Sequence, residues 1–245
     1  MKLKRIAKIF GLALISIIII GFLGMVIWAR TGEREAQATA VAALESTESL
    51  MITQENWIVF DPVVDTEVGM IFYPGGLVEA QAYSPILRQI AEEGVFIIIT
   101  PMPLNLAIFD TNAANEVINT FPLIKTWIIA GHSLGGSAAA IYAEKNPEKI
   151  NTIVFWDSYP PDSSNLSDNQ VSALSIYGTM ENQPNNSVLE KTHLLPTDTI
   201  YIGIEGANHA QFGDYGPQAG DVEALITPED QYNQVAEIML DFINP

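Results

Sequence analysis

The chain contains no cysteine, which excludes disulfide bridges, Cys-ligated zinc, iron–sulfur clusters and thiol catalysis. Basic residues are also scarce, because 11 Lys and Arg stand against 29 Asp and Glu, and the formal charge is −18. A nucleic-acid partner is not expected, since affinity for a phosphate backbone comes largely from Lys and Arg. Any nucleophile in this protein is therefore an oxygen or a lysine.

The composition fits a packed protein. Charged side chains make up only 16% of the residues and hydrophobic ones 48%, which argues against intrinsic disorder. A chain of 245 residues has room for one ordinary domain and little more.

One long hydrophobic run lies near the N-terminus. Residues 9–29 carry no charge, and they follow a basic segment that contains Lys2, Lys4, Arg5 and Lys8. A helix of this length spans about 30 Å, the thickness of a bilayer's hydrocarbon core. By the positive-inside rule, the N-terminus stays in the cytoplasm. We therefore predict a single-pass cell-membrane protein, with residues 1–30 as cytoplasmic tip and anchor and the rest of the chain extracytoplasmic.

A cleaved secretory signal is the alternative for this run. Ala36-Gln37-Ala38 offers a cleavage site of small residues, but the apolar part of a signal is only about 7 to 15 residues long. The length of the run favours a retained anchor. Residues 31–50, rich in Ala, Thr and Glu and free of Pro, predict a helical or flexible spacer before a domain at 51–245.

From Trp57 onward, short apolar runs alternate with helix-like stretches. The runs predict strands at 57–60, 70–73, 95–100, 127–130, 152–156, 174–177 and 199–205, and the stretches between them predict helices at 83–93, 105–118, 134–145 and 228–242. Unbroken apolar strands belong in parallel sheets covered on both faces. The predicted fold class is therefore α/β, a doubly wound, mostly parallel sheet flanked by helices.

A Gly-x-Ser-x-Gly pattern, Gly131-His132-Ser133-Leu134-Gly135, stands between a predicted strand and an Ala-rich helix. The pattern suits a tight strand-to-helix turn that projects the serine hydroxyl at the carboxyl edge of the sheet, where glycines relieve crowding. The N-terminus of the helix stabilises negative charge nearby. Ser133 is the predicted nucleophile; the alternative is a serine that only caps the helix.

A serine hydroxyl needs a base at neutral pH, and the chain has three histidines. His209 follows the last predicted strand, at the same sheet edge as Ser133, and is the predicted base. His132 adjoins Ser133 and more plausibly shapes the turn. His193 precedes the last strand and is expected at the surface.

The acid that orients the base is expected between Ser133 and His209 in the chain. Glu181, after the penultimate predicted strand, is preferred, and Asp157, after the strand before it, is the alternative. Asp162 and Asp168 are less well placed. Since the chain has 29 acidic residues, a solvated loop carboxylate is the competing interpretation for each.

An oxyanion hole requires two preorganised N–H donors. The amide of Leu134 follows the nucleophile directly and is predicted to be one. The second is expected in the loop after an early strand, where Gly75-Gly76-Leu77 stands, with Gly76 the first choice and Leu77 the second. An ordinary turn is the alternative for this pair of glycines.

The order of these residues resembles the α/β-hydrolase superfamily, and within it the compact α/β-hydrolase-5 group, related in shape to dienelactone hydrolases. The resemblance runs from Trp57 to the C-terminus and rests on IFYPGGLVEAQAYSPILRQIAEEGVFIIITPMPLNLAIF, AGHSLGGSAAAIYA, LSIYGTMEN and IEGANHAQFGDYGPQAGD. It implies Ser133 as nucleophile, Glu181 as acid and His209 as base. The group's acid is commonly Asp, whereas this chain has Glu181. Dienelactone hydrolases use a Cys nucleophile, so their chemistry is not implied.

We therefore expect a membrane-anchored, extracytoplasmic serine hydrolase of carboxylesterase type. It would cleave a small-molecule ester, or less readily an amide, through an acyl-enzyme on Ser133, with no metal or organic cofactor. A hydrolase-fold module without catalysis, used for binding or as a scaffold on the cell envelope, is the alternative. Transacylation, in which an alcohol replaces water, is a third.

Overall fold

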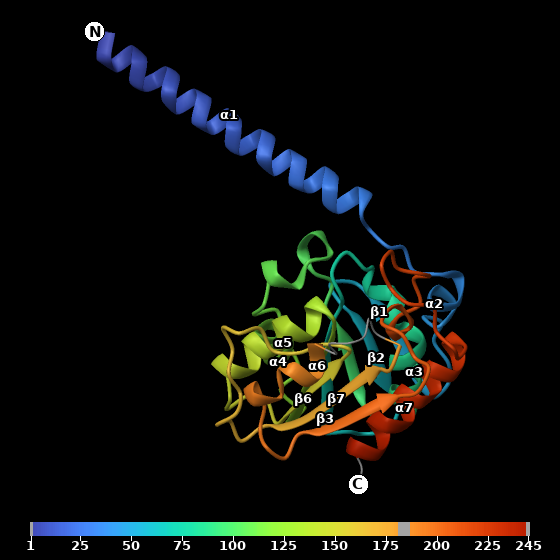
Figure 1. Ribbon diagram of the computed structural model, residues 1–245. Helices are drawn as coiled ribbons and strands as arrows, with labels where there is room; N and C mark the ends of the chain where they lie inside the picture. Colours follow the sequence, from blue (N-terminus) through green and yellow to red (C-terminus); the bar gives the residue numbers. More distant parts are fainter. Residues whose placement is uncertain (1, 181–186, 244–245) are drawn as a thin grey trace. The chain divides into compact units, whose positions relative to one another are not determined.

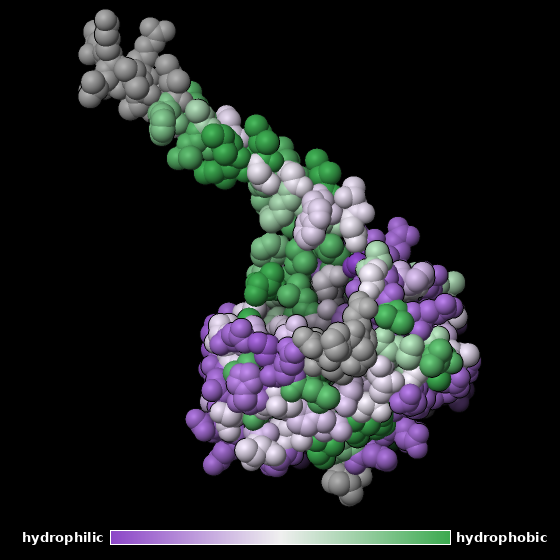
Figure 2. Space-filling view, in the orientation of Figure 1, coloured by the Kyte–Doolittle hydropathy of each residue, from purple (hydrophilic) through white to green (hydrophobic). Residues whose placement is uncertain are grey.

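The computed structural model describes residues 2–180 and 187–243, and it divides into the units Met1–Glu33 and Arg34–Pro245. The first unit consists mainly of one helix, α1 (Lys2–Thr31). Over 22 residues, Phe10–Thr31, this helix is long and apolar enough to cross a membrane. Figure 2 shows apolar side chains along it, and the large ones are exposed. A signal sequence would have the same character.

The second unit is built on an eight-stranded sheet in the order β1-β2-β4-β3-β5-β6-β7-β8. The strands are β1 (Leu50–Gln54), β2 (Ile58–Pro62), β3 (Val68–Tyr73), β4 (Phe96–Ile99), β5 (Thr126–His132), β6 (Thr152–Trp156), β7 (Ser172–Gly178) and β8 (Ile200–Ile204). β1 and β2 are antiparallel to their neighbours, and all pairs from β4 to β8 are parallel. The predicted mostly parallel α/β sheet is confirmed.

Helices cover both faces of this sheet (Figure 1). The α-helices of this unit are α2 (Ala38–Ala42), α3 (Ser84–Glu92), α4 (Ala114–Thr120), α5 (Leu134–Lys145), α6 (Ser187–Glu190) and α7 (Pro228–Ile243). Short 3-10 turns are η1 (Ala80–Tyr83), η2 (Pro103–Asn105), η3 (Ala107–Phe109), η4 (Thr192–Leu194) and η5 (Ala210–Phe212). α3 and α7 contribute to one hydrophobic core, and α4 and α5 to the other.

The central strands read as unbroken apolar runs because both of their faces are buried. In β3, Met70 and Phe72 point into the core under α3 and α7, whereas Ile71 and Tyr73 point into the core under α4 and α5. Successive residues of a strand face opposite ways, so a strand covered on both sides has no polar position. The pairing keeps the carboxyl ends level: Tyr73 pairs with Gly131, and His132 with Trp156.

The structure differs from the sequence prediction near the N-terminus and before α4. Residues 34–50, predicted as part of a spacer over 31–50, belong to the second unit. Arg88 Nη1 donates hydrogen bonds to the carbonyls of Ala43 and Glu45, which fastens this segment to α3. The strand β1 was not predicted. The helix expected at 105–118 begins at Ala114, because Leu106 and Asp110 adopt non-helical backbone angles, with φ of −129° and −146°.

Candidate active site

Ser133 occupies the turn between the end of β5 at His132 and the start of α5 at Leu134. Its backbone lies in the left-handed region, with φ 51° and ψ −123°, a conformation that costs a non-glycine residue about 1–3 kcal/mol. Hydrogen bonds hold it there. The Ser133 N–H donates to the Trp156 carbonyl at 3.2 Å, and Ser158 Oγ donates to the Ser133 carbonyl at 2.5 Å. The serine is thus held half-buried at the carboxyl edge of the sheet.

The glycines beside the serine are required by close backbone approach. A Cβ on Gly131 would lie 2.5 Å from the carbonyl carbon of Gly135, and a Cβ on Gly135 would lie 2.0 Å from the oxygen of Tyr73. These neighbours are backbone atoms, which cannot rotate away. The Gly-x-Ser-x-Gly pattern therefore reflects the packing of α5 against β3 and β5.

His209 and Asp157 meet at this edge. Asp157 directly follows β6 and His209 follows β8, and His209 Nδ1 lies 2.5 Å from Asp157 Oδ2. The Asp157 side chain is fully buried, and its second oxygen accepts the N–H of Gly178 at 3.3 Å. A buried carboxylate fixes the imidazole with Nδ1–H as donor and leaves Nε2 as the basic nitrogen.

The other acidic candidates named from the sequence stand as follows. Glu181, the preferred acid of the sequence analysis, lies outside the described residues. The carboxylate of Asp162 is exposed and pairs with Lys191 at 2.5 Å. His193, expected at the surface, is exposed.

The loop after β3 presents one unpaired amide. The N–H of Gly75 donates to the Tyr83 hydroxyl at 2.9 Å, that of Leu77 to the Asn105 carbonyl at 2.7 Å, and that of Val78 to the Gly75 carbonyl at 3.3 Å. Within the described residues, the N–H of Gly76 has no such partner. The Leu134 N–H, in the first turn of α5, is also free of intrahelical bonding. Gly76 therefore has the unused donor, and Leu77 does not.

His132 lies beneath this site. It is buried, and its Nδ1 lies 2.9 Å from the hydroxyl of Tyr83. Its ring stands 4.5 Å from that of His209 and 5.8 Å, stacked, from Phe212. Burial lowers the pKa of His132 well below its usual value of 6.5, and the charge of His209 lowers it further. His132 is therefore a neutral member of the core, in line with the predicted role in shaping the turn.

Two contributors to the site were not singled out from the sequence. Ser158 supports the backbone of Ser133, and Tyr83 links Gly75 to His132. Burial raises the pKa of Tyr83 well above 10, so its hydroxyl keeps its proton. Tyr83 lies within the stretch that carries the resemblance but was given no role there, and Ser158 belongs to none of the quoted stretches; the packing beside α3 and β6 brings both here.

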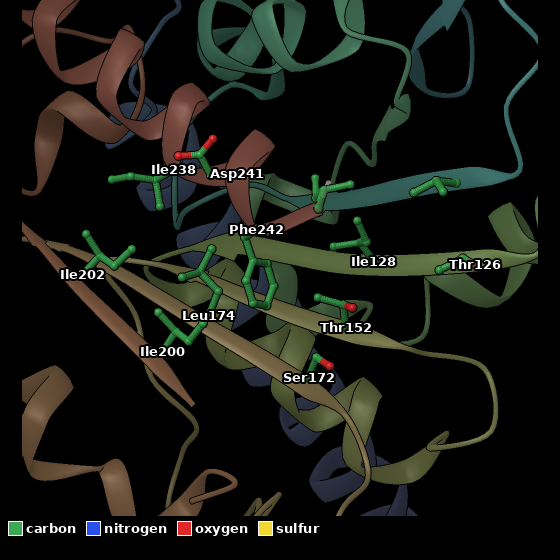
Figure 3. Close-up of a pocket in the computed structure, with 12 residues that line it drawn as sticks. Thr126, Ile128, Thr152, Ser172, Leu174, Ile200, Ile202, Ile238, Asp241 and Phe242 are labelled. Atoms are coloured by element: carbon green, nitrogen blue, oxygen red, sulfur yellow. The ribbon is translucent and has the colours of Figure 1, made fainter. Parts of the chain in front are cut away.

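A cavity of about 550 Å³ lies elsewhere, between α7 and the sheet (Figure 3). Residues near the starts of the strands, including Thr126, Thr152 and Ser172, line it together with Asp241 and Phe242 of α7. Ser133, Asp157 and His209 stand at the opposite, carboxyl edge. This cavity is therefore separate from the candidate active site.

Comparison with known proteins identifies the family. The model of the Alpha/beta hydrolase family matches residues 69–233, which is more than half of the chain. The chain belongs to the alpha/beta hydrolase family. The matched part extends from β3 into α7 and includes Ser133, Asp157 and His209. The resemblance described from the sequence is thereby confirmed.

Solved structures share the alpha/beta hydrolase fold. Est1E from Butyrivibrio proteoclasticus with bound ferulic acid has a TM-score of 0.58 at 12% identity, covering 82% of this chain and 98% of that chain. MGS-MChE2, an alpha/beta hydrolase from the metagenome of lagoon sediments at Mar Chica, Morocco, has a TM-score of 0.59 at 16% identity, with coverages of 79% and 99%. Carboxylesterase CesB (YbfK) from Bacillus subtilis has a TM-score of 0.57 at 12% identity, covering 84% of this chain and 95% of that chain. At these identities the likeness shows the fold alone. No curated protein matches the sequence significantly.

Proposed function

We propose that this alpha/beta hydrolase is a serine esterase with Ser133 as nucleophile, His209 as base and Asp157 as acid. The observation that carries the proposal is the 2.5 Å contact between His209 Nδ1 and the buried Asp157 carboxylate, at the sheet edge where Ser133 occupies its left-handed turn. Along the chain, nucleophile, acid and base occur in that order, as in the family's motif.

In the proposed reaction, Ser133 Oγ attacks the carbonyl carbon of the ester while His209 Nε2 takes its proton. Asp157 stabilises the imidazolium that forms. The amides of Leu134 and Gly76 donate hydrogen bonds to the oxyanion, a contribution worth about 3–4 kcal/mol of barrier per donor. His209 returns the proton to the leaving alcohol, and water then releases the acyl group from Ser133 by the same steps.

Asp157 is preferred to Glu181 as the acid. Both oxygens of Asp157 are engaged, one by His209 and the other by the N–H of Gly178, and its side chain is excluded from solvent. These two hydrogen bonds hold the carboxylate in one orientation toward the imidazole, as the acid of a catalytic triad requires. Glu181, which the family resemblance implied, becomes the alternative.

An ester with an apolar acyl group suits the surroundings of Gly76. The side chains of Leu134 and Leu106 flank this glycine, 3.2 and 3.7 Å from the position of a Cβ built on it. Apolar walls around a few polar donors are typical of small-molecule sites. Ferulic acid in Est1E and the carboxylesterase description of CesB also favour an ester over an amide.

The proposal includes retention of α1 as a membrane anchor with the hydrolase unit outside the cytoplasm. The uncharged span after four basic residues supports it. Cleavage at Ala36-Gln37-Ala38 would also remove Arg34, whose backbone pairs with Val78 in the folded unit. A signal peptide is not expected to form part of the fold that it leaves behind.

The experiment that tests the activity uses the full chain in detergent, treated with a fluorophosphonate and mapped by peptide mass spectrometry. An adduct on Ser133 is expected, absent in Ser133→Ala and strongly reduced in His209→Ala. Turnover of short-chain aryl esters should follow the same pattern. A folded protein that neither reacts nor hydrolyses esters would contradict the proposal and favour the module without catalysis.

A further inference from the structure

Residues 34–39, named here the strap, connect the segment after α1 to the loop that holds Gly76. Only Gly32 and Glu33 stand between Thr31, the end of α1, and Arg34. The Arg34 N–H donates to the Leu77 carbonyl at 2.7 Å, and the Glu79 N–H donates to the Arg34 carbonyl at 3.1 Å. The strap is therefore paired with this loop as a short parallel bridge.

The Arg34 side chain also binds the loop. Its Nη1 donates to the Gly76 carbonyl at 3.3 Å, while the N–H of the same peptide, that of Leu77, donates to the Asn105 carbonyl at 2.7 Å. The Gly76–Leu77 peptide is thus held at both its polar ends. The N–H of Gly76 is the polar group of this stretch left for the substrate oxyanion.

The far end of the strap is fastened to the loop of the base. The Gln37 N–H donates to the Asp214 carbonyl at 2.8 Å, and the Thr39 hydroxyl donates to the Asp214 carboxylate. Asp214 follows His209 by five residues and donates its own N–H to the Ala82 carbonyl at 2.7 Å. One short segment therefore joins the oxyanion loop to the loop that carries His209.

The charge of Arg34 also influences the pKa of buried groups beneath the site. It helps to lower the pKa of the buried His132, after burial and the charge of His209. It also acts to lower the pKa of Tyr83 and Tyr215, although burial keeps both well above 10. The guanidinium thus lies close enough to influence the groups packed under the base.

We propose that Arg34 is a positioning residue for the oxyanion hole, which holds the Gly76–Leu77 peptide so that the Gly76 N–H faces the reacting carbonyl. This rests on the serine esterase mechanism proposed above. It extends the working site to the residues that follow the apolar helix. Arg34 acts through Gly76 and does not touch the substrate.

A donor that is misplaced by about 1 Å costs up to about 100-fold in rate. Arg34→Met keeps the aliphatic stem and removes the hydrogen bond to Gly76. Its kcat is expected to fall about 10- to 100-fold, with KM within about twofold, because the oxyanion forms only after the ground state. Affinity for phenylboronic acid, which forms a tetrahedral adduct on serine, should fall in parallel.

Arg88→Met is the matched control. Arg88 also donates to backbone carbonyls of the N-terminal segment, those of Ala43 and Glu45, but it lies on α3, and its described hydrogen bonds go to this segment and to Glu92. Its loss should lower the melting temperature and leave kcat and boronate affinity unchanged. All variants are measured as the full chain in detergent, with Ser133→Ala as the inactive reference.

A kcat and boronate affinity within twofold of the wild type in a folded Arg34→Met would overturn the proposal. Equal losses of kcat in Arg34→Met and Arg88→Met would also overturn it, since both would then act through stability. If Arg34→Met does not fold, Arg34→Lys decides. Lys keeps the charge without the planar fork, so an intermediate kcat is expected and wild-type values contradict the role. If Ser133→Ala retains turnover, it is the esterase proposal that fails.

Discussion

Ser133 and Asp157 leave neighbouring parallel strands with a positive backbone φ in both cases, 51° and 45°. They are also linked through the backbone: the Ser133 N–H donates to Trp156, and the Asp157 N–H donates to the Ile176 carbonyl at 2.7 Å. Left-handed angles at two non-glycine residues are costly, and such strain concentrates at functional sites. Here the positive φ turns the side chains of Ser133 and Asp157 away from the strands β5 and β6 that they follow.

The first prediction separates the two candidate acids. Asp157→Asn should lower kcat about 1,000- to 10,000-fold, because the amide cannot stabilise the imidazolium and disturbs the orientation of His209. Glu181→Gln is the matched control. Its kcat should stay within about threefold of the wild type, because the residue would then take no part in the reaction. Initial rates on an aryl ester measure both. The reverse pattern would restore Glu181 as the acid.

The second prediction concerns the turn around Ser133. Gly135→Ala should lower the free energy of unfolding by more than about 3 kcal/mol, because its Cβ would overlap the Tyr73 and Pro74 oxygens at 2.0 and 2.4 Å. The Cβ of Gly76→Ala would come no closer than 3.2 Å to a neighbour, a methyl of Leu134, and the change should cost less than about 1 kcal/mol. Urea denaturation compares them. A stable Gly135→Ala would show that α5 does not approach β3 so closely.

The third prediction follows from the lowered pKa of His132. In the unfolded chain this imidazole takes up a proton near pH 6.5, whereas in the folded protein it stays neutral to much lower pH. Below pH 6.5 the unfolded state therefore binds one more proton. Acidification then lowers the free energy of unfolding by up to about 1.4 kcal/mol per pH unit, until the native imidazole is protonated.

His132→Asn removes this titration while its side-chain oxygen still accepts from Tyr83. The stability advantage of the wild type over the variant should be constant above pH 7.5 and shrink as the pH falls from 6.5 to 5. Urea denaturation of both proteins at several pH values measures this difference in the free energy of unfolding. The titration of the many carboxylates contributes equally to both proteins and cancels. A difference that does not depend on pH would show that folding leaves the pKa of His132 unchanged, which would contradict the lowered pKa.

The fourth prediction concerns the N-terminus of the mature protein. Intact mass should correspond to a chain that retains residues 1–38, and the protein should stay with the membrane fraction after alkaline carbonate extraction. A mature chain that begins at Thr39 would identify α1 as a signal peptide. Such a chain would also lack Arg34, and with it the pairing to Val78.

Much of the fold follows from local pattern. The strands β3 to β7 appear in the sequence as apolar runs because both of their faces are covered, and α5 begins and ends where the Ala-rich stretch predicts. β1 does not appear, since it pairs with β2 alone, as an edge strand, and alternates toward solvent at Met51.

In the candidate site, only residues at predicted strand ends or within motifs could be predicted from the sequence. Ser133 and His209 stand at predicted strand ends, and Gly76 in a glycine-rich loop. The choice between Asp157 and Glu181 depends on which carboxylate reaches His209, a long-range distance that sequence spacing does not determine. The role of Arg34 could not be predicted for the same reason. Its stretch has no Pro and no strong apolar pattern, which predicts a spacer, and its hydrogen-bond partner lies more than forty positions away in the sequence.

The hydroxyl of Tyr83 has a consequence for the kinetics of the enzyme. It accepts the N–H of Gly75, so its own proton is left for Nδ1 of His132, which places the imidazole's single hydrogen on Nε2. The ring next to the base is thereby locked in one uncharged tautomer. In the proposed mechanism, in which His209 is the base, the acidic limb of a plot of log kcat/KM against pH should then rise with a slope of one, because His132 adds no second titration.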